Sequence, residues 1–336
     1  MHHAAFDEMI FQAAPLGESP PAHQPSLSVH IPVLASNKSC THPLPFLARH
    51  PPLASSDPAW PAFCGLLKDL GIPLQTEVAA LEPLAVTNIP LRFSRRNIDE
   101  GLSNTELETA EAVEIHCAAR TPGGRVAQFP IEITAWHELK ILIDTLRELA
   151  SAPIGLGLVM GDVATDMSNA LAARVDFVIL ELPTAHAELQ PSDWDTLAWG
   201  VATARRMCHQ ADVPAFPIYV DAPVTHSDVM LKLFALGASA LTIDALAASC
   251  VPAQPASAYT LPKGMLSGIS TSAIATATPV AVANLEKKLN QCITEIKLRL
   301  RQQQLEHLSD LNPDHLRALN SRSAQLCCLR SLTTTP

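Results

Sequence analysis

Short apolar runs alternate along the chain with longer segments in which apolar residues recur every three or four positions. The clearest example surrounds Gly237. Residues 216–220 are a run of strand-forming residues, and residues 228–236 carry apolar residues at helical spacing up to that glycine. Residues 240–243 form a second apolar run, and a further helix can begin at Asp244. The order strand, helix, strand, helix is the repeating unit of a parallel α/β fold.

The same patterns predict six further strands upstream, over residues 28–35, 72–76, 88–93, 112–117, 154–160 and 177–182. Helices are predicted over residues 60–70, 105–111, 136–150, 166–173, 193–210 and 284–305, with another opening at 312–314. Eight strands that alternate with helices at this spacing favour a closed (β/α)8 TIM barrel over an open sheet. The predicted fold class is therefore α/β.

Three parts are expected along the chain. Residues 1–27 are rich in proline, serine and histidine and predict a flexible N-terminal arm. Residues 28–250 form the barrel, within which 41–58 is a proline-rich connection and 120–128 a basic loop containing glycine. Residues 251–336 are a long loop followed by a C-terminal helical extension packed on the barrel.

Composition narrows the classes of partner and location. The formal net charge is -10, which argues against nucleic acid and anionic membrane surfaces as partners. Hydrophobic residues make up 48% of the chain, enough for a large core. The longest apolar runs are too short for a bilayer, and the first ten residues lack the pattern of a signal peptide. We therefore expect a cytoplasmic protein without membrane insertion.

The cysteines and histidines do not predict a metal site. The eight cysteines include no C-x-x-C pair and the thirteen histidines no H-x-x-H pair, so neither zinc nor an iron–sulfur cluster is indicated. Reduced cysteines that act as small core residues are expected instead. Glycine is scarce, with 13 residues, whereas an average usage of ~7% would give about twice as many. Loops that bind phosphate through backbone amides usually contain several glycines.

Six blocks of the chain match, in order, the motifs of one known family. H-I-P-V-L-A-S-N-K-S is similar to D-I-P-I-F-I-S-G-M-S, G-I-P-L-Q-T-E-V-A-A-L-E-P to G-T-A-I-N-T-G-E-G-G-L-L-P, and A-V-E-I-H-C-A-A-R-T-P-G-G to A-I-E-I-K-I-G-Q-G-A-K-P-G. A-P-I-G-L-G-L-V is similar to A-P-I-S-V-K-L-V, A-L-G-A-S-A-L-T-I-D-A-L to A-L-G-A-D-A-V-G-I-G-T-A, and L-S-D-L-N-P-D-H-L-R-A-L to L-S-P-E-D-L-R-A-L. From about residue 28 to about residue 319, the chain resembles the FMN-binding domain of the glutamate synthase family.

The resemblance implies a TIM barrel, FMN as the cofactor and oxidoreductase activity. It also implies that any flavin or other ligand lies at the carboxyl ends of the strands. The positions of this chain that it places there are Ser36, Ser39, Thr76, Arg96, His116, Asp221 and Asp244.

The chain departs from the family at these same strand ends. Asn37 replaces a glycine, Gly157 replaces the lysine expected to favour reduced flavin, and the phosphate motif D-G-G-x-R-T-G has become D-A-P-V-T-H-S from Asp221 onward. Asp244 stands where the family has glycine in I-G-T, so a carboxylate would face the phosphate. Two unit charges ~5 Å apart at an effective dielectric near 20 repel by about 3 kcal/mol. Of the family's iron–sulfur cysteines, Cys250 alone remains.

Several of these positions also have a plain structural interpretation. His116 is either a residual proton donor or a histidine hydrogen-bonded to a neighbour. Asp244 binds a cation or a sugar hydroxyl, or it caps the helix that follows. The arginines can converge on an anionic ligand or form a solvated basic rim; they are Arg92, Arg95, Arg96, Arg120 and Arg125.

Three functional hypotheses follow from these observations. The main one is a glutamate-synthase-like barrel with eroded FMN and phosphate sites. Such a barrel would have no catalytic residues and would serve as a structural or regulatory subunit bound to another protein or to itself. The alternative is an FMN-dependent oxidoreductase with a rewired pocket, which is suggested by fold analogy. The third is a different small ligand, bound through Arg96, His116 and Asp221.

Overall fold

The structure is a computed structural model of the 336-residue chain. It describes residues 4–12, 23–32, 39–49, 53, 59–77, 92–96, 110–121, 124–127, 135–149, 152–182, 190–250 and 279–330. For 4, 76–77, 92–96, 118–121, 124–127 and 279 it describes the backbone alone.

A parallel sheet forms the centre of the described structure. Its parallel strands are β4 (Phe46–Leu47), β5 (Leu74–Glu77), β6 (Arg92–Arg96), β7 (Ala112–Thr121), β9 (Ile154–Val159), β10 (Phe177–Glu181), β11 (Ile218–Asp221) and β12 (Ala240–Thr242). They neighbour one another in the order β4-β12-β11-β10-β9-β7-β6-β5. A parallel bridge between Ala48 and Leu74 links β4 to β5, the two ends of this path. The predicted α/β class is therefore confirmed.

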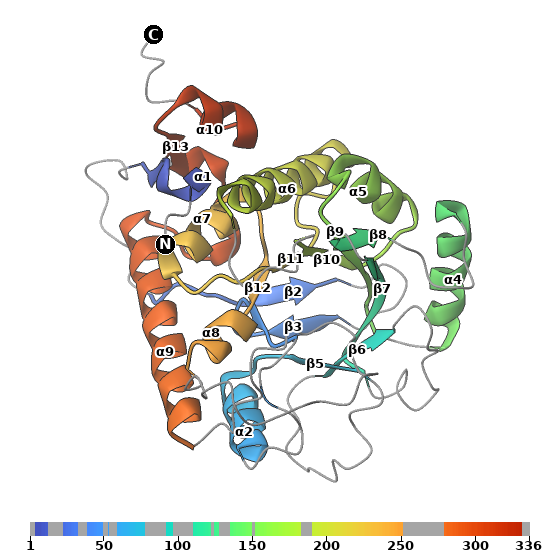
Figure 1. The fold of residues 1–336 in the computed structure, drawn as a ribbon, viewed down its shortest axis with the longest axis horizontal. Coiled ribbons are helices and arrows are strands. Elements are labelled where there is room, and N and C mark those ends of the chain that lie inside the picture. Colours follow the sequence, from blue (N-terminus) through green and yellow to red (C-terminus); the bar gives the residue numbers. More distant parts are fainter. Residues whose placement is uncertain are drawn as a thin grey trace.

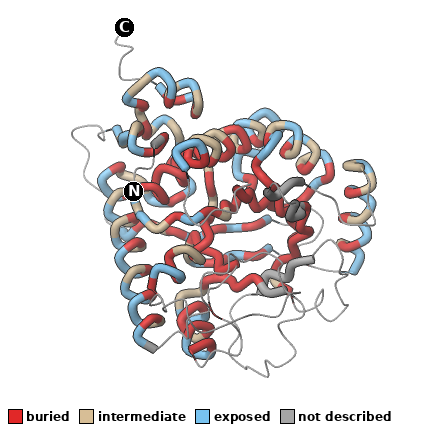
Figure 2. The backbone as a smooth tube through the Cα atoms, in the orientation of Figure 1, coloured by how far each residue is buried: buried red, intermediate tan, exposed pale blue. Residues whose placement is uncertain are grey.

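Helices surround the sheet. They are α2 (Trp60–Leu70), α4 (Trp136–Leu149), α5 (Val163–Ala172), α6 (Pro191–Gln210), α7 (Ser227–Leu236), α8 (Asp244–Ala248) and α9 (Pro279–Gln302). Figure 1 shows α9, α6, α5, α4 and α2 arranged around the strands. Buried residues gather along the strands and on the inner sides of the helices, as Figure 2 shows. Within the described residues no helix is long and apolar enough to cross a membrane.

Helix ends follow the signals in the sequence. α2 ends at Gly71 and α7 ends at Gly237, with φ angles of 64° and 117°. Both glycines donate their amides to carbonyls of the last helical turn, and their left-handed backbone is unfavourable for other residues. Asp162 caps α5 by accepting a hydrogen bond from the amide of Thr165, 3.3 Å away. The helical predictions over these segments are confirmed within a few residues.

The strand predicted over residues 28–35 does not belong to the parallel sheet. β2 (Val29–Ile31) pairs antiparallel with β3 (Cys40–His42), and this hairpin packs on the inner face of the sheet. Its buried partners there are Leu47, Ala112, Phe177, Ile179, Tyr219 and Ala240. Ala112, Phe177 and Ala240 are the first residues of their strands, so the hairpin covers the amino ends of the sheet. The first parallel strand is β4, inside the segment 41–58 that was predicted to be a connection; two residues are too short for a periodic signal.

Other segments also differ from the predictions. The loop expected over 120–128 is a hairpin, because β7 runs on to Thr121 and pairs antiparallel with β8 (Gly124–Ala127). The helix expected from Asn312 is one 3-10 turn (Pro313–His315), followed by β13 (Leu316–Ala318). Most of the predicted helix 105–111 and most of the long loop predicted over 251–280 lie outside the described residues.

The expected N-terminal arm contains two ordered elements. α1 (Ala4–Asp7) and β1 (Met9–Phe11) precede the parallel sheet, and β1 pairs antiparallel with β13 near the other end of the chain. Phe6 and Met9 are both fully buried, so apolar contacts hold this part of the arm in place. A short helix, α10 (Ser321–Cys327), lies beside it. All eight cysteines are free and seven are buried, which confirms their expected place as core residues.

A buried histidine on the β2–β3 hairpin makes stability depend on pH. His42 Nε2 lies 2.7 Å from the hydroxyl of Tyr219. Burial lowers the pKa of His42 to about 4, against the opposing effect of its bond to the Leu44 carbonyl. Because this pKa is below that of the unfolded chain, the stabilisation is present above about pH 6.5 and is lost as pH falls toward 4.

We therefore expect the free energy of unfolding of the wild type to fall by about 2–3 kcal/mol between pH 7 and pH 4 through this group alone. His42→Gln should flatten that part of the profile in urea unfolding experiments. His30→Gln, an exposed position on the same hairpin, is the control and should leave the slope as it is. Equal slopes in all three proteins would contradict the assignment.

Candidate functional site

Polar side chains collect on the inner face at the carboxyl ends of the parallel strands. We call this group the mouth; its members are Arg49, Gln75, Glu114, His116, Glu181, Asp221, Thr242 and Asp244. Alternate residues of a strand share a face, so Glu114 and His116 both point inward from β7. β10 and β11 consist of buried apolar residues up to their last positions, which are Glu181 and Asp221. By the same alternation these two side chains also face inward. Active sites of TIM barrels lie at this end of the strands.

Arg49 is the centre of the mouth. Its side chain is fully buried and follows directly after β4 and Ala48. One terminal nitrogen, Nη2, donates to Glu114 Oε1 at 2.6 Å and also to Glu181 Oε1, and the other, Nη1, donates to Asp221 Oδ2 at 2.7 Å. Nε donates to Gln75 Oε1 at 2.7 Å. One guanidinium thus holds four side chains from four different strands.

Further contacts fix the partners of Arg49. Gln75 donates its amide nitrogen to Glu114 Oε2, and Thr242 donates its hydroxyl to Asp221 Oδ1 at 2.9 Å. The Asp244 carboxylate accepts from the backbone amide of Arg49, with distances of 3.0 and 3.2 Å to its two oxygens. The predicted role of Asp244 as a helix cap is wrong: Ile243 is the N-cap residue of α8, and Asp244 follows it.

Electrostatics keep the arginine charged. Burial alone would lower the pKa of Arg49, but the charges of Glu114, Glu181 and Asp221 outweigh it and raise that pKa well above its usual value. The side chains of Glu114 and Glu181 are buried, and that of Asp221 is 17% exposed. Three carboxylates therefore share one guanidinium.

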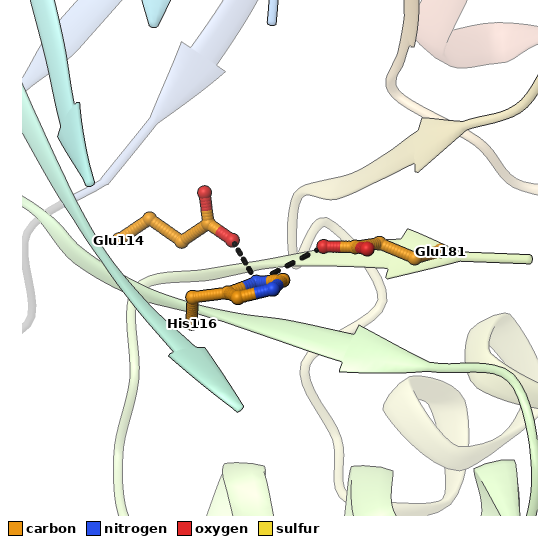
Figure 3. A group of neighbouring side chains, drawn as sticks. All are labelled: Glu114, His116 and Glu181. Carbon is orange, nitrogen blue, oxygen red and sulfur yellow. Dashed lines mark hydrogen bonds and ion pairs between the residues drawn. The ribbon is translucent and has the colours of Figure 1, made fainter. Parts of the chain in front are cut away.

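His116 lies between two of these carboxylates (Figure 3). Its Nδ1 is 3.0 Å from Glu181 Oε1 and 3.3 Å from Glu114 Oε1. Ionised carboxylates only accept hydrogen bonds, so Nδ1 carries the hydrogen. Arg49 Nη2 is 3.4 Å from the same nitrogen, but both are donors, and we therefore count this approach as a contact rather than a bond.

Gly157 on β9 makes room for this arrangement. A Cβ added at Gly157 would lie 2.0 Å from Glu114 Oε1 and 2.8 Å from His116 Nδ1. The position that corresponds to a lysine in the glutamate synthase motif is therefore occupied, in space, by Glu114 and His116. A longer side chain fits there only if both move.

The three residues of Figure 3 have the composition of a metal site. Glu114, His116 and Glu181 place one ligand atom each within 4.8 Å of one another. However, Arg49 Nη2 already bonds to both glutamates, and a divalent cation among them would face a full positive charge at contact distance. Among the described side chains, Arg49 therefore takes the place that a metal ion would have between the two glutamates.

The mouth brings together three of the seven site residues suggested by sequence. His116, Asp221 and Asp244 all contact Arg49. Thr76 and Arg96 lie on β5 and β6, where the structure describes only the backbone, and Ser36 lies outside the described residues. Ser39 is exposed beside β3, on the hairpin that covers the opposite ends of the strands.

Sequence reasoning missed Arg49, Gln75, Glu114, Glu181 and Thr242. Two signals were present for the glutamates. Glu114 stands two residues before His116 inside an apolar strand, and Glu181 closes the run F-V-I-L-E. Charged residues on the inner side of a buried strand indicate a polar network. Arg49 follows the short apolar run Phe46-Leu47-Ala48. The first-strand motif of the glutamate synthase family was matched to residues 30–39 instead.

The described residues of the mouth do not fit the phosphate of FMN. A phosphate is usually bound by backbone amides at a helix N-terminus or by free cations. Here Asp244 opens α8, and Arg49 is already bonded to three carboxylates. The added negative charge would meet the carboxylate of Asp244 at the start of α8.

Comparison with known proteins gives a fold and no family. No family model matches the chain, and no curated protein sequence matches it. Among solved structures, the flavin-binding domain of baker's yeast flavocytochrome b2 superposes with a TM-score of 0.60 at 14% identity, covering 94% of this chain and 77% of that one.

A mandelate oxidase variant carrying an FMN adduct gives a TM-score of 0.58 at 12% identity, over 91% and 87% of the two chains. The monotopic membrane protein (S)-mandelate dehydrogenase gives 0.57 at 14%, over 94% and 91%. The chain therefore has a TIM-barrel-like fold that is also found in FMN-dependent oxidoreductases, at identities that show the fold alone. A specific likeness to glutamate synthase is not among these findings.

Proposed function

We propose that this chain is a closed (β/α)8 barrel of the glutamate synthase type that has lost FMN and catalysis, and that it acts as a structural or regulatory subunit. The observation that carries the proposal is the Arg49 network. It fills the inner face of the mouth with one guanidinium and three carboxylates, in a fold whose structural neighbours include flavoproteins.

Two features of the mouth support the loss of the cofactor. The carboxylates repel an anionic group, and Gly157 leaves no cation in the place where the family motif has lysine. The retained core supports a continuing role, because two clusters of buried apolar residues are present in the described residues. A partner protein or a second copy of this chain would supply that role.

A second candidate is an FMN-dependent oxidoreductase with a rewired pocket. The fold comparison favours it, since a neighbour carries an FMN adduct and another is a flavin-binding domain. In this case the flavin would be held by residues other than those that define the mouth.

One experiment separates the two candidates. Protein purified from its own cells would be examined by absorbance spectroscopy and native mass spectrometry. The first proposal expects no flavin absorbance and a mass that includes a second protein or a second copy. A stoichiometric flavin spectrum would overturn it and establish the second candidate. A flavin-free monomer would contradict the subunit role.

The charge of Asp244 can be tested with two ligands that differ by one phosphate. Asp244→Asn should tighten binding of FMN by up to about 100-fold, because removing one charge ~5 Å away is worth about 3 kcal/mol. Binding of riboflavin, which lacks the phosphate, should not change. Affinities would be measured by flavin fluorescence quenching. If the ratio of the two affinities is the same in both proteins, Asp244 does not face the phosphate.

A further inference from the structure

The outer side of α4 carries an exposed, uncharged row of side chains, which we call the α4 ridge. Its members are Ile141, Thr145 and Leu149, which recur every four residues and therefore lie in one row along the helix. Ile141 is 64% exposed, Leu149 is 54% exposed, and Thr145 is exposed between them. The Thr145 hydroxyl donates to the Ile141 carbonyl at 2.9 Å, so its hydrogen is already used within the helix. The ridge therefore gains by contact with another apolar surface.

The α4 ridge is separate from the side of the helix that packs on the protein. That side is formed by Leu139, Ile143 and Leu146, which are buried. Single exposed apolar side chains are normal on protein surfaces. Here two of the seven large apolar side chains that are exposed in the described part of the chain share one row. The helix itself lies at the edge of the ring of helices, where a second molecule can reach it (Figure 1).

A charged row runs beside the ridge. Lys140, Asp144 and Glu148 each stand one position before a ridge residue, so they form a parallel row on one side of it. Lys140 and Asp144 are paired at 2.5 Å, and Glu148 is exposed at the far end of the row. The row thus begins with a cation and ends with an anion. Such an order is complementary to its own reverse.

We propose that the α4 ridge is the contact between two copies of this chain, which pack antiparallel about a two-fold axis at Thr145. Ile141 and Leu149 each lie four residues from Thr145. The axis therefore places Ile141 of one copy against Leu149 of the other. It also keeps the two charged rows on the same side of the pair and reverses one of them, so that Lys140 of one copy approaches Glu148 of the other.

The general rules of helix packing agree with this arrangement. Rows of residues four apart are the ridges that pack most often between helices. A two-fold contact requires a surface that is complementary to itself, which the order of the charged row provides. A parallel pairing would put the two charged rows on opposite sides and lose this match. Asp144, which lies nearest the axis, meets its own copy there, and its bond to Lys140 offsets that repulsion.

The contact is small, and the dimer is therefore expected to be weak. One ridge on one helix buries less than the ~1,200 Å² of a standard interface. This inference rests on the subunit role of the proposed function, and it names the partner as a second copy of this chain. It does not depend on the state of the mouth, because α4 lies outside the sheet and the mouth lies on its inner face.

Sedimentation equilibrium of the full chain would measure the association. We expect the wild type to approach the mass of two chains as its concentration rises toward about 1 mM. Ile141→Asp should keep the mass of one chain, because it places a charge inside the contact. Leu298→Asp is the matched control, since Leu298 is 55% exposed on α9, and this variant should associate like the wild type. A wild type that is still monomeric at about 1 mM, or a dimer that Ile141→Asp leaves intact, would overturn the proposal.

The folding of these variants is checked by melting curves. Both changes are at exposed positions, so the curves should match that of the wild type. If Ile141→Asp were unfolded, Leu149→Asp at the other end of the ridge makes the same test. A folded Leu149→Asp protein that still dimerises like the wild type would contradict the α4 contact.

Reversal of charges tests the antiparallel orientation. Lys140→Glu and Glu148→Lys should each weaken the dimer by about three- to tenfold, because an exposed ion pair is replaced by a like-charge pair that occurs twice about the axis. The double variant restores opposite charges across the contact and should bind like the wild type. A double variant as weak as the single variants would contradict the antiparallel arrangement.

A cysteine on the axis tests the position of the contact. Thr145 faces its own copy, so Thr145→Cys should form a covalent dimer under mild oxidation. The background is Cys328→Ser, because Cys328 is the exposed one of the eight cysteines. Thr294→Cys on α9 is the control, since Thr294 is also exposed and also donates to a carbonyl four residues earlier. Equal yields of covalent dimer from the two variants would count against the α4 contact.

The two proposals fail in different ways. A flavin-bound protein whose dimer is lost in Ile141→Asp would refute the loss of FMN and keep the α4 contact. A flavin-free dimer that Ile141→Asp leaves intact would refute the α4 contact alone. A different protein that copurifies with the wild type but not with Ile141→Asp would show that the ridge binds another partner, and the self-association proposed here would be wrong.

Discussion

Replacing Arg49 by methionine should lower the free energy of unfolding by about 3–5 kcal/mol, because removing one partner of a buried ion pair leaves an uncompensated charge. At this position the effect falls on three carboxylates at once, and Gln75 also loses its donor. Methionine keeps most of the side-chain volume, so the loss is electrostatic rather than a cavity. Urea unfolding followed by circular dichroism would measure it.

The pH dependence of this variant separates charge from packing. A buried carboxyl group without a cation has a pKa above that in the unfolded chain. The free energy of unfolding of Arg49→Met is therefore highest at low pH, where the carboxyl group is protonated in both the folded and the unfolded state. It falls as the pH rises through the raised pKa. The gap between wild type and Arg49→Met should be widest near neutral pH and should narrow on acidification. A gap that does not vary with pH would show that packing is responsible.

A surface ion pair provides the control. Lys140 and Asp144 are paired four residues apart on α4, with side chains 48% and 49% exposed. Lys140→Met removes a cation from a carboxylate in the same way, but exposed pairs contribute less than about 1 kcal/mol. If both variants lost similar stability, burial would not be the cause of the effect at Arg49.

Replacing Arg49 by lysine should restore only part of the stability. Lysine keeps the charge, but its single ammonium cannot reach Glu114, Glu181 and Asp221 with the fork geometry of a guanidinium. We expect Arg49→Lys to fall between the wild type and Arg49→Met in urea unfolding. A lysine variant as stable as the wild type would show that charge alone is required at this position.

The fold could be predicted from the sequence because its signals are local. Apolar alternation and helical periodicity mark β7, β9, β10, β11 and β12 and the helices between them, and glycines mark the ends of α2 and α7. β4 was missed for a physical reason. It has two residues, and its place in the sheet is set by pairing with β12, which is almost two hundred residues away.

The site was only half predictable. His116, Asp221 and Asp244 were found because they stand at the ends of recognisable strands. Arg49 was not, because it follows β4, which lies in the segment predicted to be a proline-rich connection. A network whose side chains come from several strands has no signature at any one position. The side chains come together only when the strands pair in the folded sheet. The order of the elements along the chain does not determine that pairing.

Adding a methyl group at Gly157 should test whether the network is as tightly packed as its geometry indicates. The new Cβ would lie 2.0 Å from Glu114 Oε1, and Glu114 is fully buried and bonded to Arg49 and Gln75. It cannot move without breaking those bonds. We expect Gly157→Ala to cost about 1–3 kcal/mol, the range for an overpacked core, in urea unfolding experiments.

The matched control for this variant is Gly161→Ala, just beyond β9, where an added Cβ meets no atom within 4 Å. Its stability should stay within about 0.5 kcal/mol of the wild type. A double variant tests whether Glu114 is the group that the added Cβ meets. If it is, Gly157→Ala should lower the free energy of unfolding less in a Glu114→Ala background than in the wild type, because neighbouring substitutions couple. A Gly157→Ala protein as stable as Gly161→Ala would show that the carboxylate has room to withdraw. The family's lysine could then be accommodated at this position, and the main structural objection to a retained flavin site on β9 would disappear.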